Sequence, residues 1–154
     1  MGFKPHLRRL QHVWIEHPCY FVTTCVQGRR PILATPLAQS VLVEEWRRLA
    51  DSVAWQVGPY VIMPDHVHFF ATPAPAASRD LSYWIGRWKR ATATRLNRFS
   101  HWELPFWQPG FFDHVLRSAA SRGEKWDYLR QNPVRAGLVT DAAQWPYMGS
   151  VHFQ

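Results

Sequence analysis

The sequence has no hydrophobic run that approaches the roughly 20 residues needed to span a bilayer, so we expect no transmembrane helix. No apolar stretch follows the charges of the N-terminus, and we expect no secretory signal. Cysteine is scarce: if Cys19 and Cys25 lie in one strand, about 20 Å separates them, too far for a disulfide. We therefore expect buried or free thiols in a reducing compartment, the cytoplasm.

Acidic residues are also few. The chain carries 11 Asp and Glu against 18 Lys and Arg, which gives a formal net charge of +7. This charge favours a polyanionic partner, either nucleic acid or an anionic membrane surface. No segment has the continuous amphipathic pattern of a membrane anchor. We therefore expect a nucleic-acid partner, no membrane partner, and association with the nucleoid.

Hydrophobic residues make up 47% of the 154 residues, which suits a single domain with a core of its own. The sequence shows no repeat and no second domain. We divide the chain into a basic N-terminal arm at 1–17, a core at about 18–140 and a C-terminal tail at 141–154. Arg8 and Arg9 in the arm lie either in a solvated tail or on phosphates, and the sequence favours neither.

Periodicity, caps and turn residues predict seven elements in the core. Strands are expected at 20–26, 53–63, 67–72 and 111–117, and helices at 36–50, at 78–99 and from a capping box at Ser121–Glu124 to about Asn132. Pro64-Asp65 predicts a hairpin turn that places the third strand inside the sheet. The order β-α-β-β-α-β-α indicates an α+β sandwich of ferredoxin-like type with an antiparallel sheet. Leu138-Val139 is compatible with a further short strand.

The chain is organised around the stretch Pro64-Asp65-His66-Val67-His68. Alternate residues of a strand point to the same face, so His66 and His68 would present two imidazoles side by side. Val67 would pack on the opposite face. Two neutral imidazole nitrogens are half of a metal site, although a His-x-His pair in a strand is more often without a metal.

A third ligand and a nucleophile are available on the last predicted helix. Tyr128 and Asn132 are four residues apart, so they would share a helix face. The amide oxygen of Asn132 can join two imidazoles, and three neutral ligands leave the cation its full charge for a phosphodiester. Tyr128 would stand one turn away, with Lys125 supplying positive charge for its deprotonation. The alternatives are a core tyrosine and an asparagine that only stops the helix before proline.

The predicted helix 78–99 is the densest basic segment of the sequence, with six cations and one acid. The cations that we select there as phosphate contacts are Arg87, Lys89, Arg90, Arg95 and Arg98. A charged helix face is usually just solvated. The excess of cations and the interleaved Tyr83 and Trp84 nevertheless favour contact with phosphates.

Two motifs resemble one known family. Pro64–His68 looks like the HUH motif (histidine, apolar residue, histidine). Tyr128–Val139 is similar to the tyrosine-helix signature of REP-associated tyrosine transposases, which are single-tyrosine HUH enzymes related to the small insertion-sequence transposases. Phe106–Gln108 and Asp113–Arg117, which contains His114, resemble the segment that precedes that helix. The resemblance covers about residues 18–140.

The resemblance implies an enzyme that binds single-stranded or hairpin DNA and cuts one strand. Tyr128 would attack a phosphodiester, leaving a 5′-phosphotyrosine and a free 3′-hydroxyl, while Mg²⁺ or Mn²⁺ would sit on His66, His68 and Asn132. Rejoining reverses the attack, so no nucleotide cofactor is expected. The family's substrates are repetitive extragenic palindromes (REP), read as a hairpin with a short flanking tetranucleotide. His114 and Lys125 are supporting candidates, and the family contains monomers and dimers.

The choice between the two ions follows from ligand chemistry. Imidazole suits Mn²⁺ better than Mg²⁺, which prefers oxygen. We therefore expect Mn²⁺ to support activity at least as well as Mg²⁺.

Two other functions are compatible with the same residues. The first is a ferredoxin-like module that grips nucleic-acid hairpins by charge and aromatic stacking without cutting them. The second is a metal-dependent hydrolase, in which Asp65 or Asp113 joins the histidines and water is the nucleophile.

Overall fold

In a computed structural model of the chain, residues 18–75, 77, 80–100 and 105–154 are described. The strands are β1 (Cys19–Cys25), β2 (Trp55–Ile62), β3 (His66–Pro73), β4 (Phe112–Leu116) and β5 (Met148–Ser150). The helices are α2 (Pro36–Val53), α3 (Leu81–Ser100), α4 (Ala119–Leu129) and α5 (Asn132–Arg135), with short 3₁₀ helices at Gln27–Arg29 and Ala142–Gln144. Arg8, Arg9 and the predicted helix start at Ser78 lie outside the described residues.

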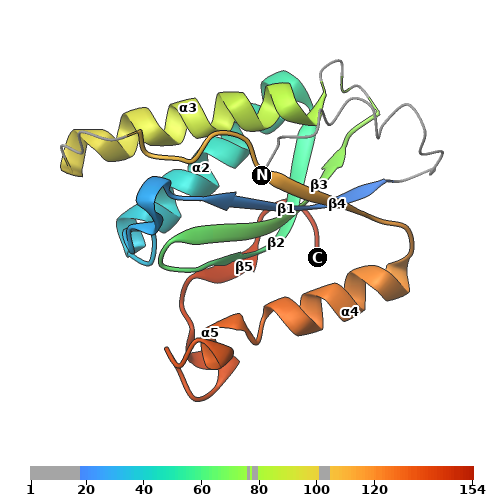
Figure 1. Ribbon diagram of the computed structural model, residues 1–154. Coiled ribbons are helices and arrows are strands. Elements are labelled where there is room, and N and C mark those ends of the chain that lie inside the picture. Colours follow the sequence, from blue (N-terminus) through green and yellow to red (C-terminus); the bar gives the residue numbers. More distant parts are fainter. Residues whose placement is uncertain (1–17, 76, 78–79, 101–104) are drawn as a thin grey trace.

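The five strands form one antiparallel sheet in the order β4-β1-β3-β2-β5. β3 therefore lies inside the sheet beside its hairpin partner β2, as Pro64-Asp65 predicted. Figure 1 shows α2 and α3 on one face of the sheet and α4 on the other. The predicted α+β sandwich of ferredoxin-like type is confirmed.

Helix starts follow their capping side chains. Thr35 caps α2, its hydroxyl accepting a hydrogen bond from the Ala38 N–H at 3.1 Å, and Pro36 occupies the first helical position. The capping box predicted at Ser121–Glu124 is wrong. Ser118 is the N-cap of α4, and its hydroxyl accepts from the Ser121 N–H at 3.0 Å, while the Ser118 N–H donates to the Ser121 hydroxyl at 3.1 Å.

The main core lies between the sheet and the pair of helices α2 and α3. Trp46 of α2 stacks on Trp88 of α3 with ring centroids 5.1 Å apart, and Trp55 stacks on Trp84 at 5.5 Å. All four of these indoles are essentially buried. Tryptophan therefore serves mainly as packing material in this layer, and this core fixes the sheet on which the functional residues stand.

The opposite face of the sheet carries a smaller apolar cluster under α4. Its buried members are Cys19, Val61, Met63, Phe70, Leu116 and Leu129. Both cysteines are buried free thiols, as expected, and burial raises the pKa of Cys19 to about 11. No helix among the described residues is both long and apolar enough to cross a membrane.

The C-terminal tail differs from the prediction. Leu138-Val139 is not a strand, because α5 ends in a turn in which Gly137 adopts a left-handed φ of 73°. A strand forms later, at β5, and pairs with the outer edge of β2. Gly58 of β2 makes room for this tail, since a Cβ there would overlap the Phe153 ring.

Candidate active site

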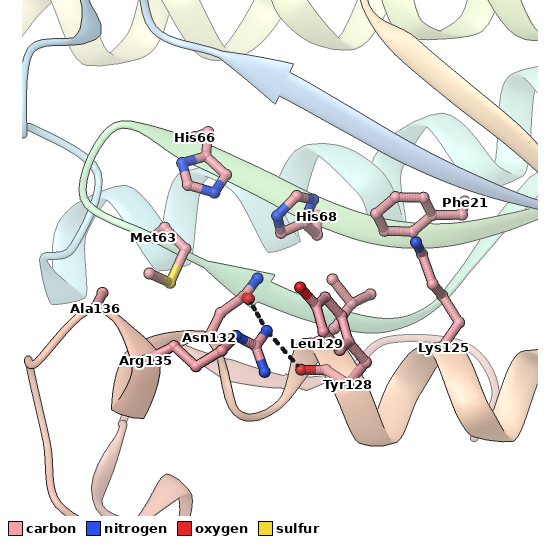
Figure 2. A pocket seen from close by; sticks show the side chains of 10 residues that line it. All are labelled: Phe21, Met63, His66, His68, Lys125, Tyr128, Leu129, Asn132, Arg135 and Ala136. Atoms are coloured by element: carbon pink, nitrogen blue, oxygen red, sulfur yellow. Dashed lines mark hydrogen bonds between the residues drawn. The ribbon is translucent and has the colours of Figure 1, made fainter.

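His66 and His68 begin β3 and point to the face of the sheet that α4 covers (Figure 2). Their ring centroids are 4.7 Å apart. Each ring is held from behind through Nδ1: His66 by the Asp65 carboxylate at 2.7 Å, and His68 by the Thr23 hydroxyl at 2.7 Å. The two Nε2 atoms are therefore the ones left for a ligand, as second-sphere partners arrange in metal sites.

Burial keeps both imidazoles neutral. It lowers the pKa of His66, although the neighbouring Asp65 carboxylate opposes the shift. It lowers the pKa of His68 to about 3, with further depression by His66 and Lys125. Near neutral pH both rings therefore keep a lone pair for a cation.

Asp65 is itself fixed by Arg29. The Arg29 Nε donates to Asp65 Oδ2 at 2.8 Å, while Asp65 Oδ1 faces His66. Burial alone would raise the pKa of Asp65, but its hydrogen bonds to His66 and Arg29 hold that pKa below its usual value. Arg29 sits at a left-handed φ of 53° after Gly28, and its Nη1 donates to Cys25 Sγ at 3.2 Å. A chain of contacts thus runs from Arg29 through Asp65 to His66.

Tyr128 lies in the last turn of α4 and lines the same cavity as the two histidines. Leu129 anchors this turn in the apolar cluster at 3% exposure, whereas Tyr128 is 60% exposed. A cavity of about 440 Å³ lies between this turn and β3 (Figure 2). Its lining consists of Phe21, Met63, His66, His68, Lys125, Tyr128, Leu129, Asn132, Arg135 and Ala136. The structure therefore brings the predicted phenol, imidazoles and amide to one cavity.

The prediction that Tyr128 and Asn132 share one helix is wrong. α4 ends at Leu129, and Asn132 begins the separate short helix α5. Pro133 has no N–H to donate to the Leu129 carbonyl, so the α-helical ladder cannot run through it. The Gln131 N–H instead bonds the Tyr128 carbonyl at 3.3 Å in a tighter turn.

Arg135 of α5 connects these two residues. Its guanidinium carbon lies 3.9 Å from the centroid of the Tyr128 ring, and its Nη2 donates to the Tyr128 carbonyl at 2.8 Å. The same Nη2 donates to Asn132 Oδ1 (Figure 2). The amide oxygen predicted to ligate a cation is therefore bonded to a guanidinium.

The two supporting candidates lie at different distances from the cavity. Lys125 lines it, with Nζ 4.5 Å from the centroid of the Phe21 ring. His114 pairs with Phe21 across β4 and β1, on the same face of the sheet, but it is exposed and does not line the cavity. Lys125 thus lines the same cavity as Tyr128, whereas its predicted role in deprotonating the phenol stays a prediction.

The predicted phosphate contacts on α3 fall into two groups. Lys89 donates to the Gln108 and Gly110 carbonyls at 2.6 and 2.7 Å, and Arg95 bonds Glu44 and Glu45 of α2. DNA would have to replace these internal partners. The exposed members of the set are Arg87, Arg90 and Arg98. All five residues belong to the layer on the far side of the sheet from α4 (Figure 1).

Neither Asp65 nor Asp113, the two acids of the hydrolase alternative, is placed to bind a metal together with the histidines. Both carboxylate oxygens of Asp65 are engaged, as described above. Asp113 is paired with Val22, a residue of the main core, so it stands on the face opposite to His68. Among the described residues, no three His, Cys, Asp or Glu side chains gather as metal ligands.

Sequence reasoning missed Arg29, Thr23 and Arg135. Thr23 and Arg29 contact His68 and Asp65 from a different part of the chain. The strand register that places Thr23 and the left-handed turn that places Arg29 are not readable from a motif. Arg135 had a signal, since it lies three residues after Asn132 and seven after Tyr128, the spacing of one helical face.

Comparison with known proteins gives the family to which this fold and cavity belong. A family model described as "Transposase IS200 like" matches residues 16–130. The chain belongs to this family of IS200-like transposases. The match contains both histidines and Tyr128 and ends before Asn132.

Individual relatives agree with this assignment. The REP-associated tyrosine transposase of Escherichia coli (strain K12) is 26% identical over 136 residues, which cover 87% of this chain and 77% of the relative. A solved structure of a REP-associated tyrosine transposase bound to a REP hairpin is similar in fold, with a TM-score of 0.74 at 22% identity, covering 96% of this chain and 82% of that one. The resemblance predicted from the two motifs is confirmed.

Proposed function

We propose that this protein is a single-strand DNA endonuclease and strand transferase that cleaves and rejoins DNA at REP-type hairpins through a 5′-phosphotyrosine. Membership of a transposase family supports DNA cleavage, and the name and bound hairpin of the two relatives support the substrate class. The observation that carries the proposal is the cavity in which Tyr128 of α4 meets His66 and His68 of β3.

Two of the three proposed ligands, His66 and His68, are already suited to bind a divalent cation. Both imidazoles are neutral and are oriented through Nδ1, which is how proteins prepare histidine for a metal. Asn132 lies at the same cavity and supplies an amide oxygen once that oxygen leaves Arg135. Mg²⁺ or Mn²⁺ bound to His66, His68 and Asn132 would supply Lewis-acid polarisation of the scissile phosphate.

The chain's own residues account for the covalent step. The Tyr128 oxygen attacks phosphorus and forms the phosphotyrosine bond as the bond from phosphorus to the 3′-oxygen breaks. The phenol loses its proton to solvent, which reaches the exposed side chain, and the 3′-oxygen takes up a proton from water. Lys125 lines the cavity and Arg135 lies over the Tyr128 ring, and their positive charge stabilises the negative charge that develops when the phenol loses its proton. Rejoining is the reverse attack by the 3′-hydroxyl.

The test is incubation with a labelled hairpin oligonucleotide and Mn²⁺, followed by a denaturing gel. We expect a covalent protein–DNA band from the native protein and none from Tyr128→Phe, a loss of at least about 1000-fold because no other group takes the nucleophile's role. Tyr83→Phe, an exposed tyrosine on the opposite layer, is the matched control and should retain the band. Absence of a band from both native protein and Tyr128→Phe, with hairpin binding intact, would favour the non-cutting binding module.

A further inference from the structure

Arg135 contacts both of the residues in the α4–α5 segment that the proposed function requires, Tyr128 and Asn132. Its guanidinium covers the Tyr128 ring at 3.9 Å and donates to the Tyr128 carbonyl at 2.8 Å. It also donates to the amide oxygen of Asn132, on the side of the cavity opposite the histidines (Figure 2). One exposed side chain therefore joins the phenol to the amide across the break between the two helices.

The bond to Asn132 has a consequence for the cation. The amide oxygen is the atom that would ligate a metal, and here it accepts a hydrogen bond from a permanently charged group. An oxygen shared with a guanidinium donates less electron density, and the guanidinium repels a divalent cation beside it. Arg135 and the cation therefore compete for Asn132.

Bound DNA can relieve this competition. Among the residues that the structure describes, no carboxylate forms an ion pair with Arg135. A guanidinium is the side chain best shaped to take two oxygens of a phosphate. Arg135 lines the cavity beside Tyr128, where a phosphate next to the scissile bond must pass.

We propose that Arg135 is a positioning residue that couples cation loading to DNA binding. In the free protein it holds Asn132 Oδ1, and a backbone phosphate of bound DNA draws the guanidinium off that oxygen, though not from the Tyr128 ring, and releases the amide to the cation. This inference rests on the proposed function, because it takes Asn132 as a cation ligand. By linkage, DNA raises the cation affinity by the same factor as the cation raises the DNA affinity.

The experiment titrates Mn²⁺, followed by the electron paramagnetic resonance of the free ion, into the Tyr128→Phe protein, which cannot cut. Without DNA, Arg135→Gln should bind Mn²⁺ about 10-fold more tightly than its parent. With a hairpin oligonucleotide the Mn²⁺ affinities of the two proteins should differ less. DNA therefore increases the Mn²⁺ affinity of Arg135→Gln by a smaller factor than that of its parent. Arg130→Gln, which removes an exposed charge from the same segment outside the cavity, should behave like the parent.

A double-mutant cycle distinguishes competition for Asn132 from simple electrostatic repulsion between the Arg135 charge and the cation. In an Asn132→Ala background, Arg135→Gln should no longer change the Mn²⁺ affinity. Equal Mn²⁺ affinities of Arg135→Gln and Arg130→Gln without DNA would overturn the inference, as would an undiminished effect of Arg135→Gln in the Asn132→Ala background. If Asn132→Ala alone binds Mn²⁺ as tightly as its parent, the ligand set of the proposed function fails instead.

Discussion

The two imidazoles at the start of β3 are oriented by different hydrogen-bond partners at Nδ1. A carboxylate faces His66 and a hydroxyl faces His68, each at 2.7 Å from Nδ1. The carboxylate fixes His66 in the tautomer that carries its proton on Nδ1, since a carboxylate accepts that hydrogen bond. Arg29 in turn orients Asp65, so the geometry of this one ring depends on two residues, one from the turn before β3 and one from the 3₁₀ helix after β1.

The half-buried His68 makes the metal-free protein sensitive to acid. Its pKa is about 3 in the folded state against the usual 6.5, so between these values the unfolded chain binds the extra proton. Stability is therefore lost as pH falls from about 6.5 towards 3, by about 2 kcal/mol at pH 5 from this group. His68→Asn should flatten the dependence of the free energy of unfolding on pH, measured by urea denaturation in EDTA from pH 7 to pH 5. Parallel curves for the two proteins would contradict the burial argument.

At the scale of single residues, the sequence predicts which side chains of one strand share a face. It does not predict which side chains from other segments contact them. The same-face placement of His66 and His68 follows from strand geometry alone. Arg29 and Thr23 reach these rings through the pairing of β1 with β3 and through a turn at positive φ. Neither the register nor a left-handed arginine is encoded by a local pattern, so neither could be predicted.

Elements with strong local signals lie close to their predicted positions. α2 begins at the Thr35-Pro36 cap and runs three residues past its predicted end, until Ala54 turns left-handed. The third predicted helix is where the prediction failed. Its cap is Ser118 rather than Ser121, and Pro133 breaks it before Asn132, so the two proposed functional residues lie on two short helices.

Substitution of two glycines, one in α4 and one in β2, tests how closely these elements are packed. Gly123 lies inside α4, and a Cβ there would meet no atom within 4 Å. Gly123→Ala should therefore raise the free energy of unfolding by about 1 kcal/mol through helix propensity. Gly58→Ala should lower it by about 1–3 kcal/mol, because the Phe153 ring occupies the space of the new methyl group. Thermal denaturation checks both, and stabilisation by Gly58→Ala would show that the tail does not pack on β2 as described.

Over the whole molecule, the sheet separates a large core from a small one. α2 and α3 bury their tryptophans on one face, while α4 is anchored on the other by the six-residue cluster around Leu129. The helix that carries Tyr128 thus rests on the smaller of the two cores. The exposed arginines Arg87, Arg90 and Arg98 lie on the larger side, so DNA that contacts them and the cavity together must pass around an edge of the sheet (Figure 1).

This uneven burial predicts that the Tyr128 helix can be loosened without unfolding the rest. Truncating a buried leucine costs about 2–5 kcal/mol, and α4 has few other buried apolar groups to compensate. Leu129→Ala should therefore speed amide hydrogen exchange in residues 119–129 at least 10-fold while leaving that of α2 unchanged. Formation of the covalent DNA adduct should fall by a similar factor, since the turn that holds the phenol at the cavity is no longer anchored.

Leu49→Ala provides the matched control in the larger core. Leu49 is fully buried on α2, and its truncation should weaken the sheet and both layers together, because this core supports the whole fold. Exchange should then quicken in α2 and in residues 119–129 alike. If Leu129→Ala produced this same uniform acceleration, α4 would be part of one cooperative unit with the main core. Docking of the tyrosine helix could not then vary independently of folding, and any adjustment of the cavity on DNA binding would be confined to side chains such as Arg135.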